Sequence, residues 1–147
     1  MPTPIREAVL AAVAARLKAQ LAGVTVLRAL RAPLDARHCP AVILRGGDMV
    51  ADEDQSFGET LWRIAFSVTG MITASEDLAA EQALSELHAK VIAALQGYDL
   101  GPATIQPNVL EATFELYAAE ESATPAGEFT ALFEATAMTP NASPYAA

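Results

Sequence analysis

The chain has 147 residues, a formal net charge of −9, a hydrophobic content of 52% and a single cysteine. This length is typical of one domain with an ordinary core, and one cysteine excludes an internal disulfide. So acidic a chain is a poor ligand for nucleic acid, and no apolar stretch approaches the roughly 20 residues that span a bilayer. We therefore expect neither direct sequence-specific nucleic-acid binding nor a membrane contact.

The charge is distributed unevenly along the chain. Residues 1–46 contain seven basic and two acidic residues, whereas residues 47–147 contain two basic and sixteen acidic residues. If the two parts face different ways in the fold, the subunit is dipolar and suits head-to-tail association. The alternative is that folding intermixes the two sets of charges, and the sequence leaves both arrangements open.

The first half of the chain is predicted to contain helix 4–22, strand 24–30, a proline-bounded loop over 32–40 and strand 41–45. Thr3 and Pro4 favour a helix start, because a hydroxyl can cap the helix and proline suits its first position. Gly23 supplies the stop. The two strands follow from one β-branched and one strongly apolar run.

A polar segment over residues 46–58 is predicted to be a long loop between two strands. Gly46 and Gly47 mark the hinge where the first strand leaves the sheet, and several carboxylates follow. Their spacing does not match a calcium-binding loop, so a solvated loop is favoured over an ion site. Residues 59–73 then alternate between apolar and polar side chains, which predicts a half-buried strand that pairs with 41–45 in a hairpin.

The second half is predicted to contain a helix to about residue 96, strand 109–119, turn 120–127 and strand 128–138, with the last two strands in a second hairpin. Thr73 and Glu76 match a capping box, which predicts the helix start, and Gly97 predicts its end. The apolar residues expected along one face of this helix are Leu84, Leu87, Val91 and Leu95, with Leu78 leading into that face. One face of strand 109–119 carries Leu110, Ala112, Phe114 and Leu116. In the closing strand, Phe129 and Phe133 are expected to face the core.

The order α-β-β-β-α-β-β predicts an α+β fold, with a mainly antiparallel sheet and two helices packed on one of its faces. Residues 1–138 are expected to form a single domain, followed by a flexible tail over 139–147. The tail has too little apolar surface to fold on itself. It is expected either to fray or to act as an arm that places Tyr145 on a neighbouring subunit.

No cluster of side chains in the sequence predicts a catalytic, cofactor or metal site. Cys39 and His88 are the available nucleophile pair, but a packed thiol and a surface imidazole are the favoured interpretation. His38, Cys39 and His88 are too few, and wrongly spaced, for a metal site. We therefore predict that the chain is not an enzyme and binds no cofactor. The alternative is a small α+β enzyme or ligand-binding domain with a cleft near Trp62, Cys39 and His88.

The order and texture of these segments resemble the tail terminator, or tail completion, proteins of long-tailed bacteriophages. The likeness rests on the N-terminal helix, the loop with Arg31, Ala32 and Pro33, the strand LWRIAFSVTG, the helix SEDLAAEQALSELHAKVIAAL and the tail SPYAA. It implies a structural virion protein that forms a homo-oligomeric ring, expected to be a hexamer. Such a ring caps the tail tube, stops its polymerisation and provides the interface for head-tail joining.

The resemblance also implies partners and a location. The partners are the chain itself, the tail tube protein and a head-tail connector or neck protein, and the location is the head-proximal end of the virion tail after assembly in the host cytoplasm. A neck or head-completion connector is the alternative role. The candidate tube-contact or ring-contact residues are Gly46, Gly47, Asp48, Asp52, Glu53 and Asp54. The candidate inter-subunit contacts are Arg28, Arg31, Arg37, Arg45, Glu111, Glu115 and Tyr145.

Overall fold

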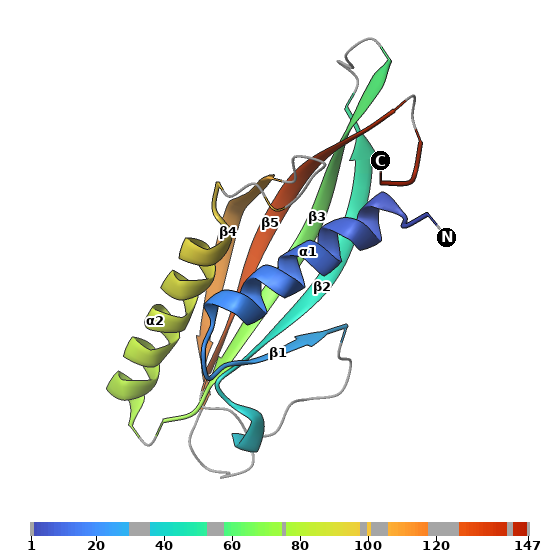
Figure 1. Ribbon diagram of the computed structural model, residues 1–147. Coiled ribbons are helices and arrows are strands. Elements are labelled where there is room, and N and C mark those ends of the chain that lie inside the picture. The colour runs from blue at the N-terminus through green and yellow to red at the C-terminus, as the bar shows by residue number, and fades with distance from the viewer. Residues whose placement is uncertain are drawn as a thin grey trace.

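The computed structural model describes residues 2–29, 36–52, 58–74, 76–97, 100, 106–117, 127–140 and 143–146. Its elements in chain order are α1 (Ile5–Gln20), β1 (Thr25–Arg28), the 3-10 turn η1 (Ala36–His38), β2 (Ala41–Ala51), β3 (Glu59–Ile72), α2 (Asp77–Leu95), β4 (Gln106–Leu116) and β5 (Gly127–Pro140). The predicted order of helices and strands is confirmed (Figure 1). Neither described helix is both long and apolar enough to cross a membrane.

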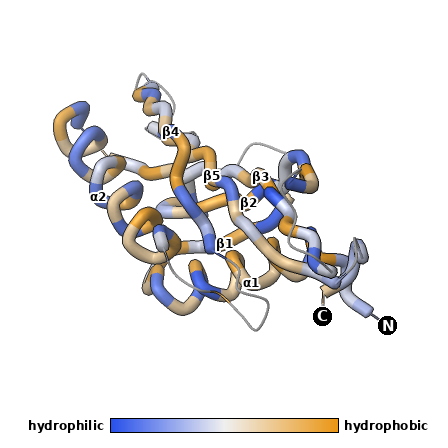
Figure 2. Tube along the Cα trace, turned by 90° about the horizontal axis from the view of Figure 1, so that it is seen from above, coloured by the Kyte–Doolittle hydropathy of each residue, from blue (hydrophilic) through white to orange (hydrophobic). Residues whose placement is uncertain are grey.

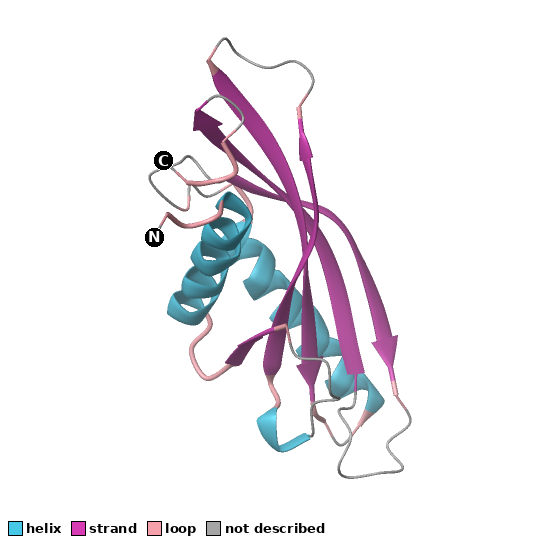
Figure 3. Cartoon of the chain, turned by 90° about the vertical axis from the view of Figure 1, so that its right-hand side faces the viewer, coloured by secondary structure: helices cyan, strands magenta, loops and turns pink. Residues whose placement is uncertain are grey.

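The strands form a five-stranded sheet in the order β1-β2-β3-β5-β4. β1 is parallel to β2, whereas the other neighbouring pairs are antiparallel, which confirms the two predicted hairpins β2–β3 and β4–β5. Figure 3 shows from the side that α1 and α2 lie on the same face of the sheet. The predicted α+β architecture is therefore confirmed, with β1 and β4 as the edge strands of the described sheet.

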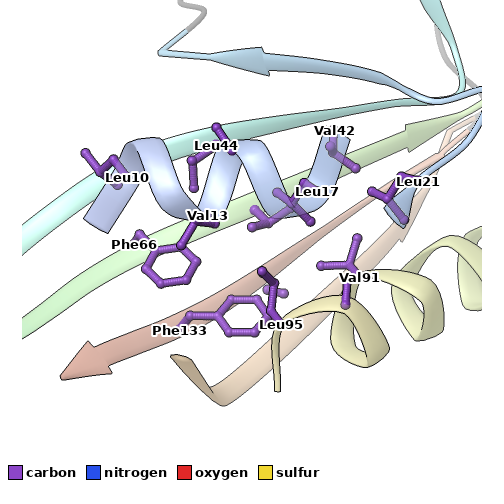
Figure 4. Packing of buried hydrophobic residues seen from close by; sticks show 14 of the residues in the cluster. Leu10, Val13, Leu17, Leu21, Val42, Leu44, Phe66, Val91, Leu95 and Phe133 are labelled. Atoms are coloured by element: carbon purple, nitrogen blue, oxygen red, sulfur yellow. The ribbon is translucent and has the colours of Figure 1, made fainter. Parts of the chain in front are cut away.

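The helices cover the sheet because each carries an apolar stripe at helical spacing. The buried residues of α1 are Ile5, Val9, Leu10, Val13, Ala14 and Leu17. Those of α2 are Ala80, Leu84, Leu87, Val91, Ala94 and Leu95. Between the helices and the sheet, Phe66 of β3 and Phe133 of β5 stack with ring centroids 5.1 Å apart, so aromatic packing joins two inner strands (Figure 4). Figure 2 shows the alternation of hydrophobic and hydrophilic residues along these elements.

The closing strand β5 has the two-sided character that its sequence predicts. Its core face consists of Phe129, Ala131, Phe133, Ala135 and Ala137, each fully buried at 0% exposure. The residues between them are half-buried or exposed, and Leu132 is the most exposed apolar one at 37%. Alternation at period two therefore sets which side of the strand faces the helices.

Strand β2 is longer than predicted, which corrects the start of the expected 46–58 loop. Residues 46–51 continue β2 to Ala51 and pair with β3, with a register shift between Gly46 and Met49. β3 is long enough to pair with this polar segment. The two glycines lie at a β-bulge, which shifts the register without ending the strand. Residues 53–57, with Glu53 and Asp54, lie outside the described part of the chain.

The start of α2 also differs from the capping-box prediction. α2 begins at Asp77, its N-cap residue is Glu76, and no side chain caps it with a hydrogen bond. Thr73 lies before the helix, so it does not pair with Glu76 as a capping box requires. Leu78 is 65% exposed rather than buried, because the helix turns that residue away from the sheet. Gly97 has φ of +73°, as expected for a glycine that ends a helix.

The end of the chain is joined to its own N-terminus. The carbonyl of Pro144 accepts a hydrogen bond from the amide of Ile5 at 2.7 Å, and the amide of Ala146 donates to the carbonyl of Thr3 at 2.8 Å. Neither of the two expected states of the tail anticipated this pairing. Trp62 supports it, because its indole Nε1 donates to Thr139 Oγ1, which in turn donates to the carbonyl of Ser143, both at 2.7 Å.

Candidate assembly surfaces

The sheet order keeps the basic and acidic parts of the described chain apart. The α1, β1 and β2 side carries the basic residues Arg6, Arg16, Lys18, Arg28, Arg37 and Arg45, with Glu7 and Asp48 as its described acidic residues. The α2, β5 and β4 side carries Glu76, Asp77, Glu81, Glu86, Glu111, Glu115, Glu128 and Glu134, with Lys90 as its described basic residue. These charges segregate across the sheet rather than intermix, because consecutive elements pair with neighbours of the same half.

A hollow of about 320 Å³ opens on the basic side, where short β1 leaves β2 uncovered. We call it the arginine hollow, and it is lined by Arg6, Leu10, Arg28, Ala29, Leu44, Arg45 and Gly46. β1 pairs only with residues 41–44 of β2, so the edge of β2 beyond them has no described strand beside it. The side chain of Arg6 reaches this stretch from α1 and donates its Nε to the carbonyl of Gly47 at 3.1 Å.

One carboxylate, that of Glu7, lies close to two guanidinium groups of the arginine hollow. Arg28 makes two hydrogen bonds to the carboxylate of Glu7, at 2.6 and 3.0 Å, and these bonds lower the pKa of Glu7. The charge of Arg6 lowers the pKa of the same carboxyl, so two guanidinium groups share one carboxylate. Gly46 makes room for this arrangement, because a Cβ there would collide with the guanidinium of Arg6 and with Leu10.

The opposite edge carries an apolar and acidic surface. We call it the β4 edge patch, and it consists of Leu110, Phe114, Glu115 and Leu116 of β4 with Glu81 and Ser85 of α2. A hollow of about 500 Å³ lies between the two elements, and buried Leu84 forms part of its wall. Phe114 and Leu116 lie beside α2 but remain 51% and 43% exposed, because the helix covers only part of the last strand.

The first part of β4 is held by the end of α2. Gln96 accepts a hydrogen bond from the amide of Val109 at 2.7 Å and donates to the side chain of Asn108 at 3.1 Å. The amide of Gly97 donates to the carbonyl of Pro107 at 3.1 Å. The free part of the edge therefore begins near the register shift between Val109 and Glu111.

The electrostatic environment of the β4 edge patch is strongly acidic. Glu115 lies directly opposite Glu128 in the β4–β5 register. Burial raises the pKa of the neighbouring Tyr117, and a hydrogen bond to Glu128 and the charge of Glu115 raise it further. Like charges directly opposite each other destabilise a strand pair, so this end of the hairpin gains from a positive partner.

The expected tube-contact residues are spread along the β2–β3 hairpin, whose far end extends beyond both helices in Figures 1 and 3. Gly46 and Gly47 lie beside Arg6 of α1, and Glu53 and Asp54 are outside the described residues. Asp48 lies within the β2 bulge, and Asp52 follows the strand. Arg63 of β3 donates to Asp52 at 3.1 Å and lies 3.7 Å from Glu134 of β5. One arginine therefore contacts two carboxylates on neighbouring segments of this end of the sheet.

The expected inter-subunit residues form separate groups rather than one cluster. Arg28 and Arg45 line the arginine hollow, whereas Glu111 and Glu115 lie on β4 at the opposite edge. Arg37 lies in η1, Tyr145 lies beside Pro4 at the start of α1, and Arg31 is outside the described residues. The sequence reasoning missed Arg6 and Phe114. The sequence does contain one signal for Arg6. This residue lies one turn before Leu10, so its side chain starts on the apolar side of the helix, near the sheet.

The residues of the alternative enzyme cleft do not meet. Cys39 lies two residues before Ala41, the first residue of β2, which pairs with Met71 of β3. Trp62 lies nine residues before Met71, roughly 30 Å away along the strand. His88 is not a surface imidazole, because it packs edge-on against Phe114 and Phe129 with ring centroids 5.0 and 5.2 Å away. The described residues contain no group of three potential metal ligands.

Comparison with known proteins gives a match of fold. The sequence matches no protein-family model, and no curated protein matches it. A chain in a solved structure described as the virion of a native gene transfer agent particle is similar in structure, with a TM-score of 0.56 and 17% sequence identity. The similarity covers 88% of this chain and 94% of that chain, so the two share one fold over most of their lengths.

Proposed function

We propose that this chain is a structural virion protein that assembles into a ring and terminates a viral tail. The ring closes the head-proximal end of the tail tube, stops its polymerisation and offers the surface that joins tail to head. Its partners are further copies of the chain, the tail tube protein and a neck or connector protein. Its work is to bind and position other proteins rather than to catalyse a reaction.

The match to the virion chain carries this proposal. That chain comes from an assembled particle, and the similarity extends over 94% of its length. The agreement is therefore between whole subunits rather than between a common motif and part of a larger protein. A fold alone does not specify a function, so the surfaces of the chain have to be compatible with assembly as well.

Two structural features fit an assembly role. One edge of the sheet is basic and hollow, the other is acidic and apolar, and such edges suit the head-to-tail contacts from which rings are built. The β2–β3 hairpin extends beyond the helices, where it can reach a neighbouring ring or the tube (Figure 1). Asp48 lies in the bulge of this hairpin and Asp52 follows β2 toward its tip, and both are candidate tube contacts.

The direct test is to add the purified protein to its tail tube protein during polymerisation. We expect the protein to bind at tube ends and to halt elongation at a low ratio of protein to tube subunits. Gold labelling in negative-stain images locates the bound protein, and tube lengths measure termination. Binding to portal-side protein but not to tube ends would favour the neck or head-completion role. No binding to either would contradict the structural virion role.

A further inference from the structure

The free edge of β4 is the first of two observations that point to a specific contact. β4 is the last strand of the described sheet, with β5 as its strand neighbour. Beyond Val109, the last β4 residue with a hydrogen bond to Gln96, Leu110 is 61% exposed and is followed by half-exposed Phe114 and Leu116. Edge strands with apolar side chains associate with other chains unless something covers them. This surface therefore needs a partner.

The chemistry of that partner follows from the charges around the free edge. Glu81 and Glu115 line the hollow of the β4 edge patch, and no described residue lining it is basic. A suitable partner presents a cation beside apolar surface. Phe114 and Leu116 keep much of their surface exposed and lose this solvent contact only when the partner covers them.

The arginine hollow on the opposite edge has these properties. Arg6 and Arg28 share the carboxylate of Glu7, so these three described residues together carry a net positive charge, and Leu10 and Leu44 provide an apolar floor. The bulge in β2 and the hydrogen bond from Arg6 to the Gly47 carbonyl block simple extension of the sheet by another strand. Contact here is therefore made by side chains rather than by a continuous β-sheet.

We propose that the β4 edge patch of one subunit docks into the arginine hollow of a second copy of the chain. The carboxylate of Glu115 meets the guanidinium of Arg6, while Phe114 and Leu116 cover the apolar floor of the hollow. The two surfaces lie at opposite edges of the same sheet, so each subunit has one of each to offer. A contact of this kind repeats from subunit to subunit and closes into a ring when the rotation allows.

The contact rests on the proposed function, because it assigns the residues through which ring subunits associate. The contact can be wrong while the proposed function is right, because a ring or a tail cap can also be built through other surfaces. The experiment therefore measures self-association and tail capping on the same set of variants.

Charge reversal tests the pairing. We expect Arg6→Glu and Glu115→Lys each to weaken self-association by about tenfold or more, as reversals of close interfacial charge pairs do. An equimolar mixture of the two variants should recover assembly, because each reversed surface then finds its complement and the wild-type surfaces still match. Sedimentation velocity measures association in solution, and imaging of tube ends measures it on the tail.

Matched controls separate the contact from general charge effects. Lys18→Glu changes the charge of α1 at an exposed position away from the hollow, and Glu86→Lys does the same on α2 at an exposed position outside the β4 edge patch. Both are expected to assemble as the wild type does. Phe114→Ser tests the apolar part of the contact without changing charge and is expected to weaken association.

The outcomes distinguish the contact from the proposed function. If both reversal variants form rings or caps as readily as the wild type does, the proposed contact is wrong, whereas the proposed function still holds. Weakened assembly without recovery in the mixture would also overturn it, provided that circular dichroism shows both variants folded. A protein that stays monomeric in solution and on tube ends would overturn the contact and the proposed function together.

Discussion

At the scale of single residues, Gly70 and Phe129 fit tightly together across two paired strands. Phe129 of β5 is fully buried, and its register partner on β3 is Gly70. A Cβ on Gly70 would collide with the Phe129 ring. The ring also packs against His88 and Phe114, so it has little freedom to move aside. The absence of a side chain at position 70 therefore gives the phenyl ring its place in the core.

Gly70→Ala is expected to lower the free energy of unfolding by about 1–3 kcal/mol, as overpacking of a filled core does. Urea denaturation measures the loss. In the double variant Gly70→Ala with Phe129→Leu, the smaller side chain should accommodate the new methyl group. The double variant should then lose less stability than the sum of its two single variants. Simple additivity would show that the two residues do not compete for space.

His88 gives the chain a pH-dependent stability. Burial lowers the pKa of His88 from its ordinary value of 6.5, and no described group hydrogen-bonds its Nε2. Between the lowered pKa and 6.5, the unfolded chain binds more protons than the folded chain. The free energy of unfolding should therefore fall as pH drops from about 7.5 through this range.

His88→Phe keeps an aromatic ring between Phe114 and Phe129 but removes the titrating group. We expect its urea midpoint to change less between about pH 7.5 and 5.5 than that of the wild type, a window in which the ordinary carboxylates remain ionised. Equal pH dependence of the two proteins would assign the effect to other groups.

At the scale of elements, the C-terminal segment acts as a clasp on α1. The carbonyl of Pro144 satisfies the amide of Ile5, one of the helix-start amides that lack a partner within the helix. The ring of Tyr145 remains 43% exposed beside this clasp, so it stays available to a neighbouring subunit. The backbone of the segment and the ring of Tyr145 thus have separable roles.

Deletion of residues 143–147 is expected to keep the fold and to lower the free energy of unfolding by about 1–2 kcal/mol, because two backbone hydrogen bonds to residues 3 and 5 are lost. Hydrogen exchange at the amide of Ile5 should accelerate. Tyr145→Ala is the matched control, since it keeps the backbone bonds and removes only the ring. Weakened assembly of Tyr145→Ala with unchanged stability would support the arm role. Unchanged exchange at Ile5 in the deletion would contradict the clasp.

The sequence predicted elements well wherever a periodic apolar pattern decided them. The alternation around Phe66 and Phe133 and the stripe through Leu84 and Val91 gave the right strands, helices and hairpins. It failed where tertiary pairing overrode local composition. Residues 46–51 are polar but form a strand because they pair with β3. The C-terminal segment is hydrogen-bonded to residues 3 and 5 at the start of α1. Neither partner is visible in local composition.

The candidate surfaces were predictable only in part. The unequal charge of the two halves is a property of the sequence, but it left open whether the fold separates the two sets of charges or intermixes them. Which side chains meet depends on the sheet order, which places β4 and the β1–β2 edge at opposite ends. The exposure of Phe114 could not be predicted either. Periodicity shows toward which face of the sheet a side chain points, but not whether a helix covers it.

At the scale of the whole molecule, the separated charges make association dependent on salt. The pairs between the two edges would lie near the protein surface, where about 0.1 M salt screens charges beyond roughly 10 Å. Self-association measured by sedimentation should therefore weaken as sodium chloride rises from about 0.05 to 0.5 M. The apolar contacts of Phe114 and Leu116 are insensitive to screening, so a residual association should remain. An increase of association with salt would indicate an interface dominated by apolar surface alone.

The central claim is that this chain forms a ring that terminates a viral tail. The most direct measurement is cryo-electron microscopy of tail tubes incubated with the purified protein. The account predicts a closed ring at one end of each tube, with β4 of one subunit beside α1 and β2 of the next and the β2–β3 hairpin directed along the tail axis. Tubes with bare ends, or subunits scattered along the tube wall, would contradict it.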